Sequence, residues 1–269
     1  MAGCPSGSCG IHGVVFMGRL RGIMVMLSTA FGVLVFGGTG YLCGFFGRSR
    51  RVMAWVARNW SRSALLFTGA RITVEGRERL EAGRAYFLVG NHQSALDIPI
   101  VMLAMHGDVR FTAKESLFKT PIFGQVMRHY GYVPIDRSNA RKALRALEAA
   151  VERMQDDPIS FAVFPEGTRS TDGRLLPFRK GALKIAKLSG MPVVPFAIDG
   201  AWRVNNRMRK DIRPGPIRLV LHEPIPVEQL ACMDSSQLHD RIVGMITDTL
   251  GESPAEASTA PKLPETTSA

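Results

Sequence analysis

The stretch Ala85-Tyr-Phe-Leu-Val-Gly90 runs directly into Asn91-His-Gln-Ser-Ala-Leu-Asp97. A short apolar run that ends on a glycine and is followed at once by polar side chains predicts a buried strand with a turn at its carboxyl end. In the same way, Ile159-Ser-Phe-Ala-Val-Phe164 runs into Pro165-Glu-Gly-Thr-Arg-Ser170. Ligands of open α/β sheets collect outside the carboxyl ends of the strands, so we expect the two polar segments to form one site.

Short β-rich runs alternate with helical segments from about residue 70 onward. The expected strands span residues 71–74, 85–90, 132–135, 159–164, 193–198 and 217–222. Apolar side chains at helical spacing predict helices over residues 140–154, 178–188 and 238–250. Strands that alternate with helices predict a layered α/β domain with a largely parallel sheet.

A segment of 26 residues without a charge, Gly22 to Gly47, lies near the amino terminus and has arginines on both sides. As a helix it would reach roughly 39 Å, enough to cross a bilayer, and it is too long for a signal peptide. Its glycines leave room for a bend or for a closely packed partner helix. A spanning helix and a helix that dips into one leaflet therefore both stay open. Because arginines flank both ends, the positive-inside rule gives no orientation.

The next segment, residues 51–67, has a basic stripe opposite an apolar face that contains a tryptophan. This pattern is typical of a helix that lies in the lipid headgroup region. The alternative is a surface helix packed on the catalytic domain, and the adjacent apolar segment makes us favour the membrane. The stripe consists of Arg51, Arg58 and Arg62, and the apolar face of Val52, Met53, Val56, Trp60, Ala64 and Phe67.

His92 and Asp97 lie five residues apart, about 140° of rotation on a regular helix, so they cannot face the same way within one helix. They can pair if His92 lies in the turn after the strand and Asp97 in the first turn of the following helix. The carboxylate then accepts from one ring nitrogen, which fixes the tautomer and leaves the other nitrogen to take a proton. No Ser or Cys nucleophile is evident beside the pair, so we expect direct attack by a substrate hydroxyl.

The second polar segment suits a phosphate. Gly167 permits close backbone approach, and Arg169 can bind a phosphate through two parallel hydrogen bonds. Glu166 either ties the turn together or orients the substrate, and the sequence leaves both roles open.

The formal net charge of +11 suits nucleic acid, an anionic membrane surface or a phosphorylated substrate. No recognised nucleic-acid-binding motif accompanies this charge, and nucleic-acid binding does not need a long apolar segment. We therefore expect no nucleic-acid partner. No Cys and His set has the spacing of a zinc site, so we expect no metal.

Four blocks, taken together and in this order, resemble the glycerolipid acyltransferase family, and most closely its 1-acyl-sn-glycerol-3-phosphate acyltransferases. The blocks are Asn91-His-Gln-Ser94 with Asp97, Gly131-Tyr-Val-Pro-Ile-Asp-Arg137, Phe164-Pro-Glu-Gly-Thr-Arg-Ser170 and Met191-Pro-Val-Val-Pro-Phe196. Only Pro134 departs from the pattern, since the family often has a bulkier residue there.

The resemblance implies roles for particular residues. It makes His92 and Asp97 the catalytic dyad. It also implies a phosphate-side substrate-binding loop of Glu166, Gly167, Thr168 and Arg169, further phosphate contacts at Lys114 and Arg137, and an acyl-donor side shaped by Pro192 and Pro195. The alternative for Lys114 and Arg137 is a solvated surface charge.

The resemblance also implies a layered αβα acyltransferase domain with a largely parallel or mixed sheet, preceded by a membrane-associated helical segment. We accordingly divide the chain into a flexible leader (1–21), membrane-anchoring helices (22–69), the acyltransferase domain (70–251) and a disordered tail (252–269). The tail is rich in Pro, Ser, Thr and Ala.

The implied reaction transfers a fatty acyl group from acyl-CoA or acyl-carrier protein to the sn-2 hydroxyl of 1-acyl-glycerol-3-phosphate. The product is phosphatidic acid, an intermediate of phospholipid biosynthesis. The thioester already activates the acyl group, so we expect no metal or other cofactor. Both donors are cytosolic, which places the catalytic domain at the cytoplasmic face of a membrane, here expected to be a bacterial inner membrane, in contact with its lipid.

Two alternatives to this reaction involve related lipids. An acyltransferase that acts on another lysophospholipid or on a lyso-aminolipid stays open, although Arg137 and Arg169 favour a phosphate. A lysophospholipid hydrolase would need an attacking water or a serine elbow, and no Gly-x-Ser-x-Gly follows a strand.

Overall fold

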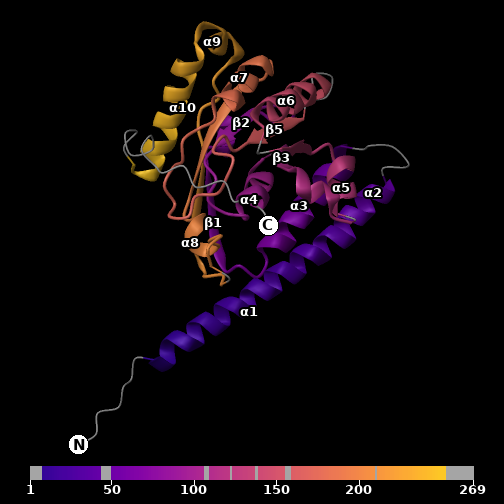
Figure 1. Ribbon diagram of the computed structural model, residues 1–269, viewed down its shortest axis with the longest axis vertical. Helices are drawn as coiled ribbons and strands as arrows, with labels where there is room; N and C mark the ends of the chain where they lie inside the picture. The colour runs from indigo at the N-terminus through magenta and orange to yellow at the C-terminus, as the bar shows by residue number, and fades with distance from the viewer. Residues whose placement is uncertain are drawn as a thin grey trace, which may run out of the picture.

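The computed structural model describes residues 8–43, 50–105, 109–121, 123–136, 139–154, 159–209 and 211–252. Within them a seven-stranded sheet forms the centre of the molecule (Figure 1). Its order is β1-β7-β6-β2-β5-β3-β4, and neighbouring strands run parallel except for the antiparallel pair β6 and β7. The strands are β1 (Ala70–Glu75), β2 (Phe87–Gly90), β3 (Val109–Lys114), β4 (Val133–Ile135), β5 (Ser160–Val163), β6 (Val193–Asp199) and β7 (Gly215–Leu221).

Helices cover both faces of the sheet, so the predicted αβα layers and mixed sheet are confirmed. One face carries α6 (Ala140–Met154), α7 (Lys180–Leu188), α9 (Val227–Cys232) and α10 (Ser235–Leu250). The other carries α3 (Arg50–Leu65), α4 (Asp97–Ala104) and α8 (Ala201–Val204). The remaining short elements are α5 (Phe123–His129) and the 3₁₀ turns η3 (Arg77–Arg79) and η4 (Glu115–Lys119).

The alternation of side chains along β2 explains why two layers of helices are needed. Phe87 and Val89 join the core under α6, α7 and α10, whereas Leu88 joins the core under α4 and α8. All three are fully buried, as expected for a central strand covered on both faces. The six predicted strands and the three predicted helices of this domain are present, with ends that differ by a few residues.

Strand β3 was not predicted from the sequence. Its six residues include Arg110 and end on Lys114, so it does not read as an apolar run. Arg110 is nevertheless buried, at 6% exposure, because β5 and β4 flank the strand.

The amino-terminal segment is a long helical rod that extends beyond the α/β domain (Figure 1). It consists of α1 (Ser8–Gly32), a π-helical turn η1 (Val33–Gly37) and α2 (Gly38–Cys43). The stretch Val15–Leu42 is the one helix in the described residues that is long and apolar enough to cross a membrane. A row of exposed apolar side chains runs along it: Phe16, Leu20, Ile23, Leu27, Phe31 and Leu34.

The rod also packs on the domain. The amide of Ile212 donates to the Gly18 carbonyl at 3.0 Å, and the Ser28 hydroxyl donates to the Ser63 carbonyl at 2.8 Å. Helix α1 begins at Ser8, so residues 8–21 are helical and the leader predicted there is wrong for them. Of the leader and the tail, residues 1–7 and 253–269 lie outside the described residues.

Helix α3 has the predicted basic stripe, but its apolar face is not free. Met53, Val56 and Ala64 are buried, while Arg58 and Arg62 are exposed. The placement of this face in the lipid headgroups is wrong for the buried residues, because other parts of the same chain cover it. Met53 and Val56 pack with Phe36 of η1 and Val126 of α5, and α1 and α4 also contact α3. The alternative, a surface helix packed on the domain, describes this side of α3.

Candidate active site

Three neighbouring parallel strands bring the predicted segments together. Strands β2, β5 and β3 lie side by side in the sheet, so their carboxyl ends share one edge. The His92 turn follows β2, the segment from Pro165 to Arg169 follows β5, and Lys114 ends β3. The amide of Ser170 donates to the His92 carbonyl at 2.8 Å and joins the first two turns. The expectation that both polar segments form one site is confirmed.

His92 and Asp97 pair in the predicted geometry. Asp97 is the first residue of α4, and its Oδ2 lies 2.7 Å from Nδ1 of His92. The same oxygen accepts from the amides of Gln93 and Ser94, each at 2.7 Å. An ionised carboxylate only accepts, so Nδ1 carries the proton and Nε2 keeps its lone pair.

Two further contacts fix the imidazole. Phe164 stacks on the His92 ring, with centroids 4.1 Å apart and planes 15° from parallel. Asn91 holds the turn to β6, since its Nδ2 donates to the Ile198 carbonyl at 2.8 Å and its Oδ1 accepts from the Ile198 amide at 2.7 Å. The ring is therefore held in both position and plane before substrate arrives.

Glu166 ties the two turns together from behind. Its Oε1 accepts from the His92 amide at 2.7 Å, and the side chain is buried. Desolvation by this burial raises the pKa of Glu166 well above its ordinary value. Of the two roles left open by the sequence, this hydrogen bond favours the structural one.

Gly167 sits where a side chain does not fit. Its φ is +69°, and an added Cβ would lie 2.8 Å from Nε of Arg179. Only glycine accepts that φ without strain and leaves the space that the Arg179 guanidinium fills.

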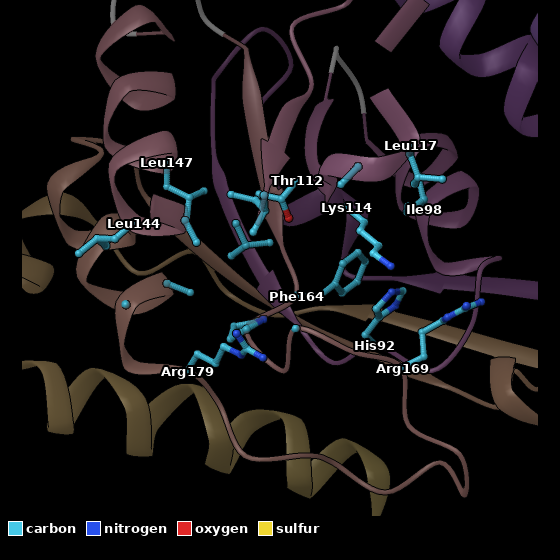
Figure 2. Close-up of a pocket in the computed structure, with 18 of the residues that line it drawn as sticks. His92, Ile98, Thr112, Lys114, Leu117, Leu144, Leu147, Phe164, Arg169 and Arg179 are labelled. Carbon is cyan, nitrogen blue, oxygen red and sulfur yellow. The ribbon is translucent and has the colours of Figure 1, made fainter. Parts of the chain in front are cut away.

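A cavity of about 450 Å³ opens at this edge of the sheet. Figure 2 shows His92, Lys114 and Arg169 close together, with Arg179 farther along the cavity and Leu144 and Leu147 of α6 at its apolar part. A cavity that presents cations beside His92 and aliphatic side chains along its wall suits an amphiphile that carries a negative headgroup.

The structure sorts the predicted binding residues into three groups. Lys114, Gly167 and Arg169 line the cavity with His92. Thr168 does not line it, and instead accepts a hydrogen bond from Arg207. Arg137 lies outside the described residues.

Pro192 and Pro195, which are expected to shape the acyl-donor side, do not line this cavity, and their role toward the donor stays a prediction. Both prolines are buried in the sheet region. The Pro192 carbonyl accepts from the Phe87 amide at 3.0 Å, and the Pro195 carbonyl accepts from the His222 amide at 2.9 Å. Their backbone oxygens thus hold strands together.

Three residues of the site were not predicted. Phe164 is the last residue of an expected strand, and Arg179 precedes α7. Arg207 belongs to an arginine-rich stretch after α8 that the sequence presents as ordinary surface charge. The order of the strands in the sheet brings Arg179 and Arg207 near the site. Their spacing along the chain from His92 therefore does not predict that they lie there.

Comparisons with known proteins agree with this geometry. The family described as Acyltransferase matches residues 71–199. A chloroplastic 1-acyl-sn-glycerol-3-phosphate acyltransferase of Brassica napus is 33% identical over 214 residues, covering 77% of this chain and 61% of its own length. A 1-acyl-sn-glycerol-3-phosphate acyltransferase of Saccharomyces cerevisiae is 30% identical over 243 residues, covering 88% of this chain and 78% of its own length.

Among solved structures, the crystal structure of the 1-acyl-sn-glycerophosphate acyltransferase of Thermotoga maritima superposes with a TM-score of 0.76 at 27% identity. The match covers 91% of this chain and 98% of that one. The chain spans about three-fifths of the length of the plant relatives such as the Brassica napus protein.

Proposed function

The chain belongs to the 1-acyl-sn-glycerol-3-phosphate acyltransferase family, and from that premise we propose that it acylates the sn-2 hydroxyl of 1-acyl-glycerol-3-phosphate to form phosphatidic acid. The observation that carries the proposal is the Asp97-held imidazole of His92 in a cavity that also presents Lys114 and Arg169. A base and two cations at one place match a substrate that carries a hydroxyl and a phosphate close together.

In this proposal His92 is the general base. Its Nε2 takes the proton of the acceptor hydroxyl while the oxygen attacks the thioester carbonyl carbon. Asp97 stabilises the imidazolium that forms. When the tetrahedral intermediate collapses, the carbon–sulfur bond breaks, and the imidazolium returns the proton to the departing thiolate. The ester and the free thiol are then both complete, and His92 is neutral again.

The cations bind the acceptor. Arg169 and Lys114 hold the phosphate beside His92, and Arg137 stays a proposed third contact outside the described residues. Gly167 lets the backbone approach the substrate, and Glu166 and Thr168 support the loop rather than contact the phosphate. The apolar side chains of α6 along the cavity wall offer space for an acyl chain.

We also propose where the reaction takes place. The donor is acyl-CoA or acyl-carrier protein, both of which are cytosolic and acidic, so the catalytic domain lies at the cytoplasmic face of a membrane. The exposed apolar row of Val15–Leu42 is the part that contacts lipid.

The test is acyl transfer by the purified protein to a panel of lysolipids, each offered with acyl-CoA and with acyl-carrier protein. We expect ester formation with 1-acyl-glycerol-3-phosphate above that with lysophosphatidylethanolamine or a lyso-aminolipid. Good turnover of another acceptor with none of 1-acyl-glycerol-3-phosphate would overturn the substrate assignment. Release of free fatty acid without a new ester would instead identify a hydrolase.

A further inference from the structure

A loop that follows α8 lies against both catalytic turns. The Asn205 carbonyl accepts from the Ser94 hydroxyl at 2.9 Å, which links the loop to the His92 turn. Asn206 is buried, and its Nδ2 donates to the Thr171 carbonyl at 2.7 Å, which links the loop to the segment after β5. The loop is thus held in place on both sides.

This anchoring brings a second arginine to the side of Arg169. Nη1 of Arg207 donates to the Thr168 hydroxyl at 2.7 Å, one residue before Arg169. Burial lowers the pKa of Arg169, and the positive charge of Arg207 lowers it further, as expected for two neighbouring guanidinium groups.

Within the part of the chain that the structure describes, the negative charge of Asp97 acts on Arg169 and raises its pKa, against the effects of burial and of Arg207. No carboxylate forms an ion pair with Arg169 or Arg207 there. Two arginines a few residues away do have a carboxylate partner. Asp211 forms ion pairs with Arg213 at 2.6 Å and with Arg209 at 3.9 Å. Two like charges held together without an ion-pair partner among the described residues favour binding of an anion that carries more than one negative charge.

We propose that Arg207 is a specificity-determining residue that acts with Arg169 to select an acceptor whose headgroup is a phosphate monoester dianion. The inference rests on the proposed function, because it assigns Arg169 to the acceptor phosphate. A phosphate monoester has a second pKa near 6 and is close to doubly charged at neutral pH, whereas a phosphodiester stays singly charged. Arg207 does not line the cavity but is held next to Arg169 through Thr168, so each guanidinium takes a share of the dianion.

The test compares wild type with Arg207→Gln on 1-acyl-glycerol-3-phosphate and on lysophosphatidylglycerol, a phosphodiester, in micelles of one composition. We expect the KM of the variant for the monoester to rise about tenfold, the size that loss of one charge-assisted hydrogen bond produces. Its kcat stays within about twofold, and its KM for the phosphodiester changes by less than about threefold. The wild-type preference for the monoester therefore falls in the variant.

Arg203→Gln is the matched control, because Arg203 is an exposed arginine of the same region that lies over the Trp202 ring, 5.2 Å from its centroid. We expect it to leave the preference unchanged, and Arg207→Lys to give an intermediate KM. Below pH 6 the monoester loses its second charge, so the difference in KM between wild type and Arg207→Gln should shrink.

An unchanged preference in Arg207→Gln, or an equal rise in KM for both acceptors, would overturn the inference alone. Failure of wild type to acylate the monoester would overturn the proposed function as well.

Discussion

Asp97 and Glu166 are both buried beside His92, and their hydrogen bonds give them different tasks. One oxygen of Asp97 accepts from the imidazole and from the amides of Gln93 and Ser94. Glu166 accepts from the His92 amide rather than from the imidazole. The second oxygen of each carboxyl group, Oδ1 of Asp97 and Oε2 of Glu166, has no hydrogen-bond partner among the described residues. The Asp97 carboxyl holds the His92 ring, and the Glu166 carboxyl holds the His92 backbone.

Glu166 predicts a pH-dependent stability. Because burial raises its pKa, the folded protein keeps this proton at a pH at which the unfolded chain, with an ordinary pKa near 4.3, has released it. Stability from this group is therefore complete below the unfolded pKa and is lost as the pH rises toward the folded value. Glu166→Gln keeps the acceptor for the His92 amide and removes the titration.

We expect the difference in Tm between Glu166→Gln and wild type to grow in favour of the variant from pH 4.5 to pH 8, by about 2–4 °C. Thermal unfolding in detergent across this range measures it. The same substitution at Glu152 of α6 is the control, because that side chain is exposed. A difference for Glu166→Gln that is the same at every pH would contradict the raised pKa.

The residues of the site divide into those that the sequence reveals and those that it does not. His92, Asp97 and Arg169 were predicted because they follow apolar strands in segments with a recognisable pattern. Thr168 was predicted as a substrate contact, but its hydroxyl binds Arg207. That bond joins residues 39 positions apart, and only the folded sheet places the loop after α8 beside the segment after β5.

Among the helices and strands, the pattern of apolar and polar residues predicts the type of element better than it predicts the surface against which that element packs. The sequence does not predict strand β3, because Arg110 interrupts its apolar run even though this arginine is buried in the fold. The amphipathic pattern of α3 is real, but amphipathicity does not distinguish lipid from the rest of the protein as the apolar surroundings. The structure shows protein on that side of α3, with Met53 and Val56 packed near Tyr130.

The rod depends on glycines at its contacts with the domain. A Cβ on Gly40 would overlap the Tyr130 hydroxyl, and one on Gly37 would lie 3.2 Å from Val126. A Cβ on Gly38 would meet nothing within 4 Å. Gly38 and Gly40, which lie two residues apart in α2, therefore form a matched pair for testing the packing.

We expect Gly40→Ala to lower the free energy of unfolding by about 1–3 kcal/mol, as overpacking does. Gly38→Ala should leave it unchanged or raise it by up to about 1 kcal/mol, because alanine favours a helix. Chemical denaturation of both variants in one detergent measures the difference. Equal effects at the two positions would show that the rod does not pack on Tyr130 as described.

At the scale of the whole molecule, the rod has one side on the domain and another that is apolar and exposed. Deleting residues 1–68 is a poor test of membrane attachment, because it would also uncover the face of the sheet that α1 and α3 protect. Point substitutions on the exposed side leave the core intact. Leu27 and Phe31, each 61% exposed and one helical turn apart, are suitable positions.

We expect the double variant Leu27→Glu with Phe31→Glu to lose at least tenfold in binding to phospholipid vesicles, since a charge in the apolar region costs about 2.5–3.5 kcal/mol. Leu188→Glu on α7 is the control, because Leu188 is 55% exposed but lies on the other layer of helices. Vesicle flotation measures the bound fraction. Wild-type binding by the double variant would mean that this side of the rod does not contact lipid.

In the proposed reaction the imidazole of His92, held by Asp97, takes the proton of the acceptor hydroxyl. The test measures phosphatidic acid formation by His92→Ala and by the control variant His239→Ala. His239 lies on the surface of α10, and its Nδ1 is 2.9 Å from Oδ1 of Asp240, so the control also removes an imidazole that contacts an aspartate. We predict that His92→Ala lowers kcat by at least about 10³-fold without lowering Tm by more than a few degrees, whereas His239→Ala keeps wild-type activity. Substantial turnover by a folded His92→Ala protein would contradict the account.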